Sequence, residues 1–182
     1  MSAPDASADT AFGLPAGTQR KAVLAVLAVY VAGFVLLWPN ALLVSDEAHY
    51  VGQAVLFSKG EVKRPFRDVI ANTTEVRPLS TYPVGTSMLQ APFVKVLGWR
   101  GAHLLSLLSL AGTVLLLLRW LAEAGRPPLF ALLPLVYAGT VVQGRLAMSD
   151  ASTALVATGA FFLFWRGTQG RSYAWLGAGF LA

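Results

Sequence analysis

Residues 22–38 read AVLAVLAVYVAGFVLLW, a run without a charged residue that follows Arg20 and Lys21. A helix that crosses a bilayer needs about 20 consecutive apolar residues. We place the first spanning helix at about 22–44, counting the less regular residues that follow the run. A cleaved signal peptide is the alternative, but further apolar segments follow, which favours an anchor that stays in the protein.

The composition of the whole chain supports a membrane protein. Of its 182 residues, 55% are hydrophobic and only 13% are charged, about half the charged fraction of an average soluble domain. The net charge is +5, yet the basic residues stand singly at the ends of apolar runs, as topology signals do. We therefore expect an all-α polytopic membrane protein with no nucleic-acid partner. The absence of cysteine excludes disulfides and thiolate metal sites.

Four further apolar segments follow the first one, at about 101–121, 128–142, 151–165 and 173–182. Residues 1–21 are predicted to be a disordered cytoplasmic tail, and residues 22–182 one transmembrane domain. The last segment has ten residues, about 15 Å of helix, which is too short to cross a bilayer. We therefore expect the domain to be incomplete and the chain to be a truncated product or a fragment.

The short basic loops predict the orientation in the plasma (inner) membrane. Arginines between the second and third segments, and between the fourth and fifth, fall on the same side as Arg20 and Lys21. The positive-inside rule puts that side in the cytoplasm, so the long loop 45–100 faces outward. In this loop we predict a helix over 46–59, an irregular stretch over 63–78, and a short helix ending near 97 that either lies at the membrane interface or enters the membrane partway.

Two adjacent carboxylates, Asp46 and Glu47, stand at the start of the outer loop. One interpretation is structural: Ser45 caps a helix, and acidic residues in its first turn suit the helix dipole. The other is catalytic, because a partly desolvated carboxylate at the lipid boundary suits proton abstraction from a hydroxyl. The two roles are compatible.

A second acidic site, Asp150, is predicted on the same outer side, after Arg145. Together with Asp46 it could hold a divalent cation, Mg²⁺ or Mn²⁺, through oxygen ligands; alternatively it caps the next helix. Arg145 could bind a phosphate or only reach toward lipid headgroups. Lys63 and its basic neighbours in the outer loop could hold an anionic headgroup, or simply balance the acidic residues of a solvated loop.

Four stretches in this order resemble the start of a GT-C fold glycosyltransferase. Residues 46–50 (DEAHY) resemble the family's Asp-Glu-x-x-Tyr, and Gly60 follows at the end of the first loop helix. Residues 82–89 (YPVGTSML) are similar to its Tyr-Pro-Pro-Gly stretch, with Val84 in place of the second proline, and residues 145–150 (RLAMSD) look like its Asp-bearing second outer loop. The likeness is greatest to polyprenyl- and dolichyl-phosphate sugar transferases, such as protein mannosyltransferases and the aminoarabinose transferase of lipid A. It covers roughly residues 20–182.

The resemblance implies roles for particular residues. Asp46 would be the catalytic base, and Glu47 beside it would orient the acceptor or a metal. The residues implied in substrate binding are Tyr50, Lys63, Tyr82, Arg145 and Asp150. The donor would be a polyprenyl-phosphate sugar, transferred with inversion to a glycan, lipid or protein acceptor outside the cytoplasm.

Two functional classes are alternatives to a transferase. A non-catalytic membrane protein, or a remnant of the same fold, agrees equally with the apolar segments. A transporter fragment is disfavoured, because transporters place charged or helix-breaking residues within the membrane, whereas the polar residues of this chain collect at the outer ends of its apolar runs.

Overall fold

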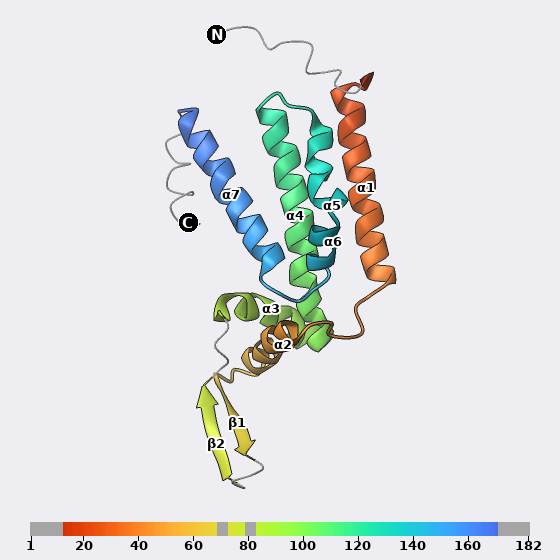
Figure 1. Cartoon of the computed structure of the whole chain (residues 1–182). Coiled ribbons are helices and arrows are strands. Elements are labelled where there is room, and N and C mark those ends of the chain that lie inside the picture. Colours follow the sequence, from red (N-terminus) through yellow and green to blue (C-terminus); the bar gives the residue numbers. More distant parts are fainter. Residues whose placement is uncertain (1–12, 69–72, 79–82, 171–182) are drawn as a thin grey trace. The chain divides into compact units, whose positions relative to one another are not determined.

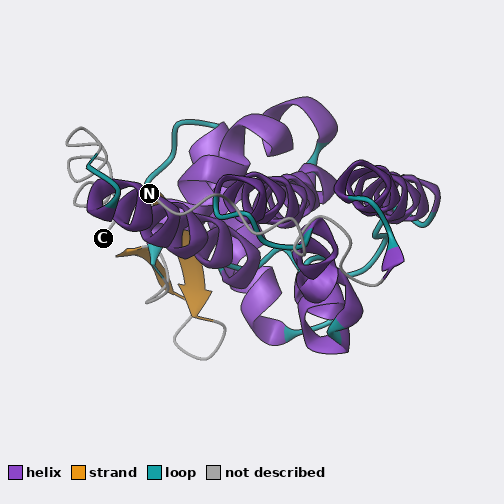
Figure 2. Ribbon diagram, turned by 90° about the horizontal axis from the view of Figure 1, so that it is seen from above, coloured by secondary structure: helices purple, strands orange, loops and turns teal. Residues whose placement is uncertain are grey.

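The structure, a computed structural model, describes residues 13–68, 73–78 and 83–170 (Figure 1). Helices predominate in it, which confirms the predicted helical class, and one β-hairpin is added (Figure 2). The helices are α1 (Ala16–Leu36), α2 (Ser45–Ser58), α3 (Val84–Leu97), α4 (Ala102–Glu123), α5 (Leu133–Val136), α6 (Ala138–Gln143) and α7 (Asp150–Thr168), with 3₁₀ turns η2 (Trp99–Gly101) and η3 (Pro128–Leu132).

The chain divides into two compact units. The helix-bundle unit takes its described residues from Met1–Trp38, Leu107–Gly144 and Asp150–Ala182. The α2–α3 unit takes them from Pro39–Ser106 and Arg145–Ser149. The α2–α3 unit therefore contains the acidic pair of α2 together with the segment that precedes α7.

The helix-bundle unit is held by apolar contacts among α1, α4, η3 and α7. Val23 of α1, Val114 of α4 and Ala131 of η3 are fully buried in one cluster. Gly112 of α4 lies close to the Leu155 side chain of α7, so these two helices approach each other at a residue without a side chain.

Two helical stretches of the described residues, α1 and Trp99–Glu123, are long and apolar enough to cross a membrane by length and composition. Much of the apolar surface of α1 is exposed: Val29 is 72% and Leu36 82% accessible. A helix that is apolar all round requires either a protein core or lipid around it. The exposed side chains of α1 therefore agree with membrane association.

The predicted spanning helix over 128–142 is wrong. The stretch consists of η3, α5 and α6, interrupted at Tyr137, whose backbone is extended (φ −79°, ψ 112°). Pro128 and Pro134 each stand at the start of a short element. Because proline lacks an N–H and its ring clashes with the preceding turn, it fits the first turn of a helix but not its interior.

The boundaries of the first helix also differ from the prediction. The helix begins at Ala16, directly after Pro15, so residues 16–21 are helical and do not belong to a tail. The Gln19 side chain donates to the Leu14 carbonyl at 2.8 Å and holds this start. The helix ends at Leu36 rather than near 44, ahead of Pro39. The predicted disorder of residues 1–12 and the partial segment 173–182 lie outside the described residues.

The predicted irregular stretch 63–78 contains a β-hairpin instead. Strands β1 (Lys63–Asp68) and β2 (Thr73–Pro78) pair antiparallel, with Lys63 opposite Pro78. Two prolines suggested a loop, but a two-stranded sheet has only edge strands, where proline is tolerated. The β-branched residues of β2 favour the extended backbone.

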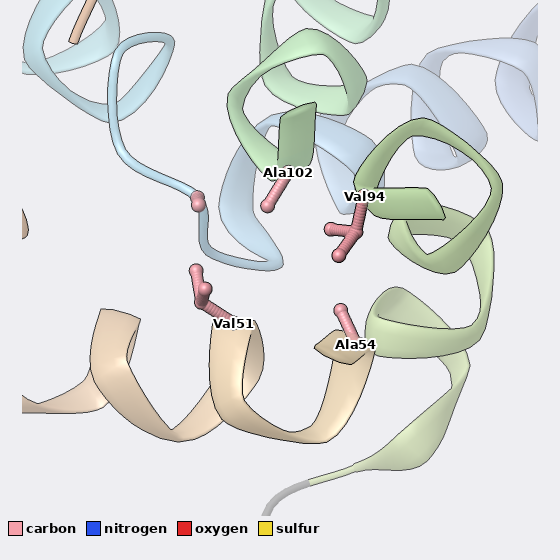
Figure 3. Packing of buried hydrophobic residues seen from close by; sticks show 5 residues of the cluster. Val51, Ala54, Val94 and Ala102 are labelled. Atoms are coloured by element: carbon pink, nitrogen blue, oxygen red, sulfur yellow. The ribbon is translucent and has the colours of Figure 1, made fainter. Parts of the chain in front are cut away.

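Small and β-branched side chains form the core of the α2–α3 unit (Figure 3). Val51 and Ala54 of α2 pack against Val94 of α3 and Ala102 of α4, and Ala147 completes the cluster. Because most of these side chains are alanine or valine, the helices and the 145–149 segment approach closely. The polar groups next to this cluster are consequently buried.

Candidate functional site

The two carboxylates at the start of α2 have different surroundings. Asp46 is half-buried, and the Ser45 hydroxyl donates to its Oδ1 at 3.3 Å. Ser45 was predicted to cap the helix, but it is the first helical residue; Val44 holds the cap position and makes no side-chain cap bond. Glu47 reaches back instead: its Oε2 accepts the Leu43 N–H at 2.7 Å, one residue before the N-cap N–H that the glutamate of a capping box binds.

The other oxygen of Glu47 points into the core of the unit. Glu47 is fully buried, and its Oε1 accepts the Ala147 N–H at 2.7 Å and lies 3.5 Å from His103 Nδ1. His103 Nδ1 lies 2.8 Å from the Arg145 carbonyl oxygen. Since a carbonyl only accepts, Nδ1 carries a proton. Backbone donors and the edge of this imidazole therefore compensate the burial of the carboxylate.

The backbone groups of the segment 145–149 are hydrogen-bonded by side chains rather than by a neighbouring turn of helix or a strand. Gln90 donates to the Ala147 carbonyl at 3.0 Å, and Ser106 donates to the Leu146 carbonyl at 2.5 Å. Buried backbone groups require such partners. We call the four side chains that bind this backbone the polar clamp: Glu47 from α2, Gln90 from α3, and His103 and Ser106 from α4.

A second set of polar contacts joins α2 to α3 beside the polar clamp. The buried Ser87 hydroxyl lies 3.0 Å from the Tyr50 carbonyl and 2.8 Å from Gln53 Oε1. The Tyr50 hydroxyl lies 3.2 Å from the Ser149 hydroxyl. These contacts fix α2 between α3 and the end of the 145–149 segment, and so fix the position of Asp46 on its first turn.

Sequence reasoning missed Gln90, His103 and Ser106. A signal was present, because polar residues recur three apart within otherwise apolar stretches: Ser87 with Gln90, and His103 with Ser106. Residues three apart share one face of a helix. Such a polar stripe on an apolar helix indicates buried hydrogen bonding.

The α2–α3 unit brings three of the predicted site residues together with Glu47. Asp46 is half-buried, Tyr50 is buried, and Arg145 is half-buried with its carbonyl in the polar clamp. Lys63 lies on β1, of which only the backbone is described, and Tyr82 lies outside the described residues.

Asp150 belongs to the helix-bundle unit, where it is exposed in the first turn of α7. It lines a cavity of about 620 Å³ with Tyr137, Gln143 and Thr158 among its neighbours. The joint Asp46–Asp150 metal site therefore stays a prediction. Within residues 13–68, 73–78 and 83–170, no three histidine or acidic side chains are grouped so as to hold a metal ion.

The acidic pair thus contains a buried carboxylate with both oxygens hydrogen-bonded, Glu47, and a partly exposed one, Asp46. Both oxygens of Glu47 accept short bonds from backbone amides, whereas Asp46, one residue away, is partly open to solvent. Of the two, only Asp46 has the access that a general base needs. No protein family, no curated protein and no solved structure matches this chain.

Proposed function

We propose that this chain is a membrane glycosyltransferase that moves a sugar from a polyprenyl-phosphate donor to an acceptor, with Asp46 as its general base. One observation carries the proposal: the buried Glu47 carboxylate anchors the first turn of α2 through bonds to two backbone amides, so that the adjacent Asp46 is held rigidly and remains partly accessible. A base must be positioned in this way to abstract a proton efficiently. The ordered resemblance to GT-C transferases supports the same assignment.

In the proposed reaction, the Asp46 carboxylate takes the proton of an acceptor hydroxyl. The acceptor oxygen attacks the anomeric carbon, the bond from that carbon to the phosphate oxygen breaks, and its electron pair leaves with the lipid phosphate. Attack opposite the leaving group inverts the anomeric centre. Arg145, half-buried beside the polar clamp, would stabilise the charge on the departing phosphate. Glu47 acts as a positioning residue rather than a catalytic one.

The proposed reaction does not use a divalent cation. Mg²⁺ requires about six oxygen ligands, and in the α2–α3 unit both oxygens of Glu47 are already bonded to backbone amides. Asp46 alone would supply one carboxylate. The donor set around α2 therefore does not fit such an ion, and a contribution from Asp150 remains a prediction.

The proposed setting is the plasma membrane, with the N-terminus in the cytoplasm and α2 on the outer side. The two helical stretches long and apolar enough to cross a membrane support an integral protein. The basic residues at the ends of apolar runs support the orientation. The acceptor would be a glycan, lipid or protein outside the cytoplasm.

A non-catalytic membrane protein is the second candidate. The bonds of Glu47 favour this candidate, since both oxygens of Glu47 bind backbone amides and therefore stabilise the fold. A protein of this kind requires the polar clamp but not the accessible carboxylate of Asp46. The two candidates therefore differ in what they require of Asp46.

Asp46→Asn is expected to lower sugar transfer about a hundredfold, because an amide cannot accept the proton at neutral pH. The chain is incorporated into membrane vesicles and supplied with polyprenyl-phosphate mannose, glucose or arabinose, together with glycan, lipid and peptide acceptors that carry free hydroxyls, and the release of polyprenyl phosphate is measured. Glu61→Gln, an exposed carboxylate beyond the end of α2, is the matched control and should keep full activity. No release by the unsubstituted chain, or full activity of Asp46→Asn, would contradict the proposal and favour the non-catalytic protein.

A further inference from the structure

The outward face of α3 is almost entirely apolar. Its inward face carries the buried residues that pack within the unit, among them Ser87, Gln90 and Val94. Val84, Met88, Pro92 and Val96 are spaced four apart and form one stripe on the opposite face, where Met88 is 58% and Val96 80% exposed. We call these four residues the α3 stripe. An apolar stripe of this extent indicates a partner surface.

Two lysines flank the α3 stripe. A groove of about 650 Å³ runs between α3 and the end of α2, with Lys59 and Lys95 on its walls. Its other lining residues are Phe57, Ser58, Gly60, Met88, Ala91 and Pro92. None of the described residues that line the groove is acidic. The groove therefore offers two positive charges above a mainly apolar floor.

We propose that this groove binds the headgroup of an acidic phospholipid, while the α3 stripe lies among the acyl chains. The charge of the groove is complementary to such a headgroup, and basic residues near a membrane surface attract anionic lipids. Lysine stems lie along apolar surface while their ammonium groups stay in the polar layer.

The length of α3 agrees with this position. With 14 residues it extends for about 21 Å, too short to cross the bilayer but suitable for lying in its interface. The stretch Trp99–Glu123, which is long and apolar enough to cross a membrane, begins two residues after α3 ends. The chain itself would therefore hold α3 near a bilayer surface. This inference does not depend on the transferase proposal.

A fluorescent probe on the α3 stripe tests the proposal. The chain has no cysteine, so Val84→Cys gives a single site for a bimane label, and Val96→Cys gives a second site on the same stripe; neither residue lines the groove. The labelled chain is incorporated into vesicles that contain either brominated phosphatidylglycerol or brominated phosphatidylcholine at the same mole fraction. Bromine quenches the label only at close range, so quenching reports which lipid lies against the stripe.

We expect phosphatidylglycerol to be enriched about tenfold over phosphatidylcholine at the probe, because two lysines act together. The double substitution Lys59→Gln with Lys95→Gln should make quenching by the two lipids equal. Arg20→Gln with Lys21→Gln removes the same charge from exposed positions on α1 and should keep the preference.

Three outcomes would overturn the proposal. If neither lipid quenches the label at either site, the stripe does not lie in lipid. If both lipids quench equally in the unsubstituted chain, the groove does not select acidic headgroups. If the double substitution of Lys59 and Lys95 leaves the preference for phosphatidylglycerol unchanged, the groove does not select the lipid.

Discussion

Glu47→Ala is expected to lower the free energy of unfolding of the α2–α3 unit by about 4 kcal/mol. The substitution removes two hydrogen bonds to an ionised acceptor, from the Leu43 and Ala147 N–H groups, both at 2.7 Å. Bonds of this kind contribute about 1.5–3 kcal/mol each, and the buried Ala147 N–H would stay unsatisfied. The Ala147 N–H would lose its bond to α2.

The loss is measured by denaturant unfolding of the purified chain in detergent micelles, together with hydrogen exchange of the Leu43 and Ala147 amides. Glu47→Gln keeps one acceptor oxygen, so its free energy of unfolding should lie about midway between those of Glu47→Ala and the unsubstituted chain. Hydrogen exchange should be faster at one of the two amides. Glu61→Ala is the matched control, because this carboxylate is exposed and lies beyond the end of α2. Equal stability of Glu47→Ala and Glu61→Ala would show that Glu47 does not hold this segment.

Gly101→Ala is expected to destabilise the same unit by about 3 kcal/mol. A Cβ atom at Gly101 would lie 2.3 Å from the Phe93 carbonyl oxygen and 2.6 Å from its carbonyl carbon. Both are backbone atoms, which cannot move aside as the end of a side chain can. The turn between α3 and α4 would have to open, and the packing of Val94 against Ala102 would be lost with it.

Thermal unfolding in micelles measures this effect, with Gly52→Ala as the control. Gly52 lies exposed in the middle of α2, and a Cβ atom there would meet no atom within 4 Å. Alanine in a helix is favoured over glycine by about 0.5–1 kcal/mol, so this variant should be at least as stable as the original chain. A Gly101→Ala variant as stable as Gly52→Ala would contradict the close approach.

Two helices of this protein follow from local sequence because hydrophobic periodicity and chain breakers agree there. The stretch of α2 is amphipathic and that of α4 apolar; both lack internal proline and end near glycine, and the structure has helices there. The helix α3 also forms, although Pro92 lies inside it. The stretch 128–142 is also apolar, yet it is divided into short pieces: Pro134 stands in the first turn of α5, and the extended Tyr137 separates α5 from α6. The hairpin was missed for the opposite reason: its prolines suggested a loop, but edge pairing accommodates them.

The sequence by itself determined that this chain has apolar helices suited to a membrane, and that two carboxylates stand together at the start of the loop 45–100. Local composition decides both features. Only the tertiary structure separated the carboxylates, because Asp46 stays accessible while Glu47 binds Ala147, 100 residues away. That division depends on burial and on backbone donors far along the chain, which no local pattern around residues 45–50 encodes.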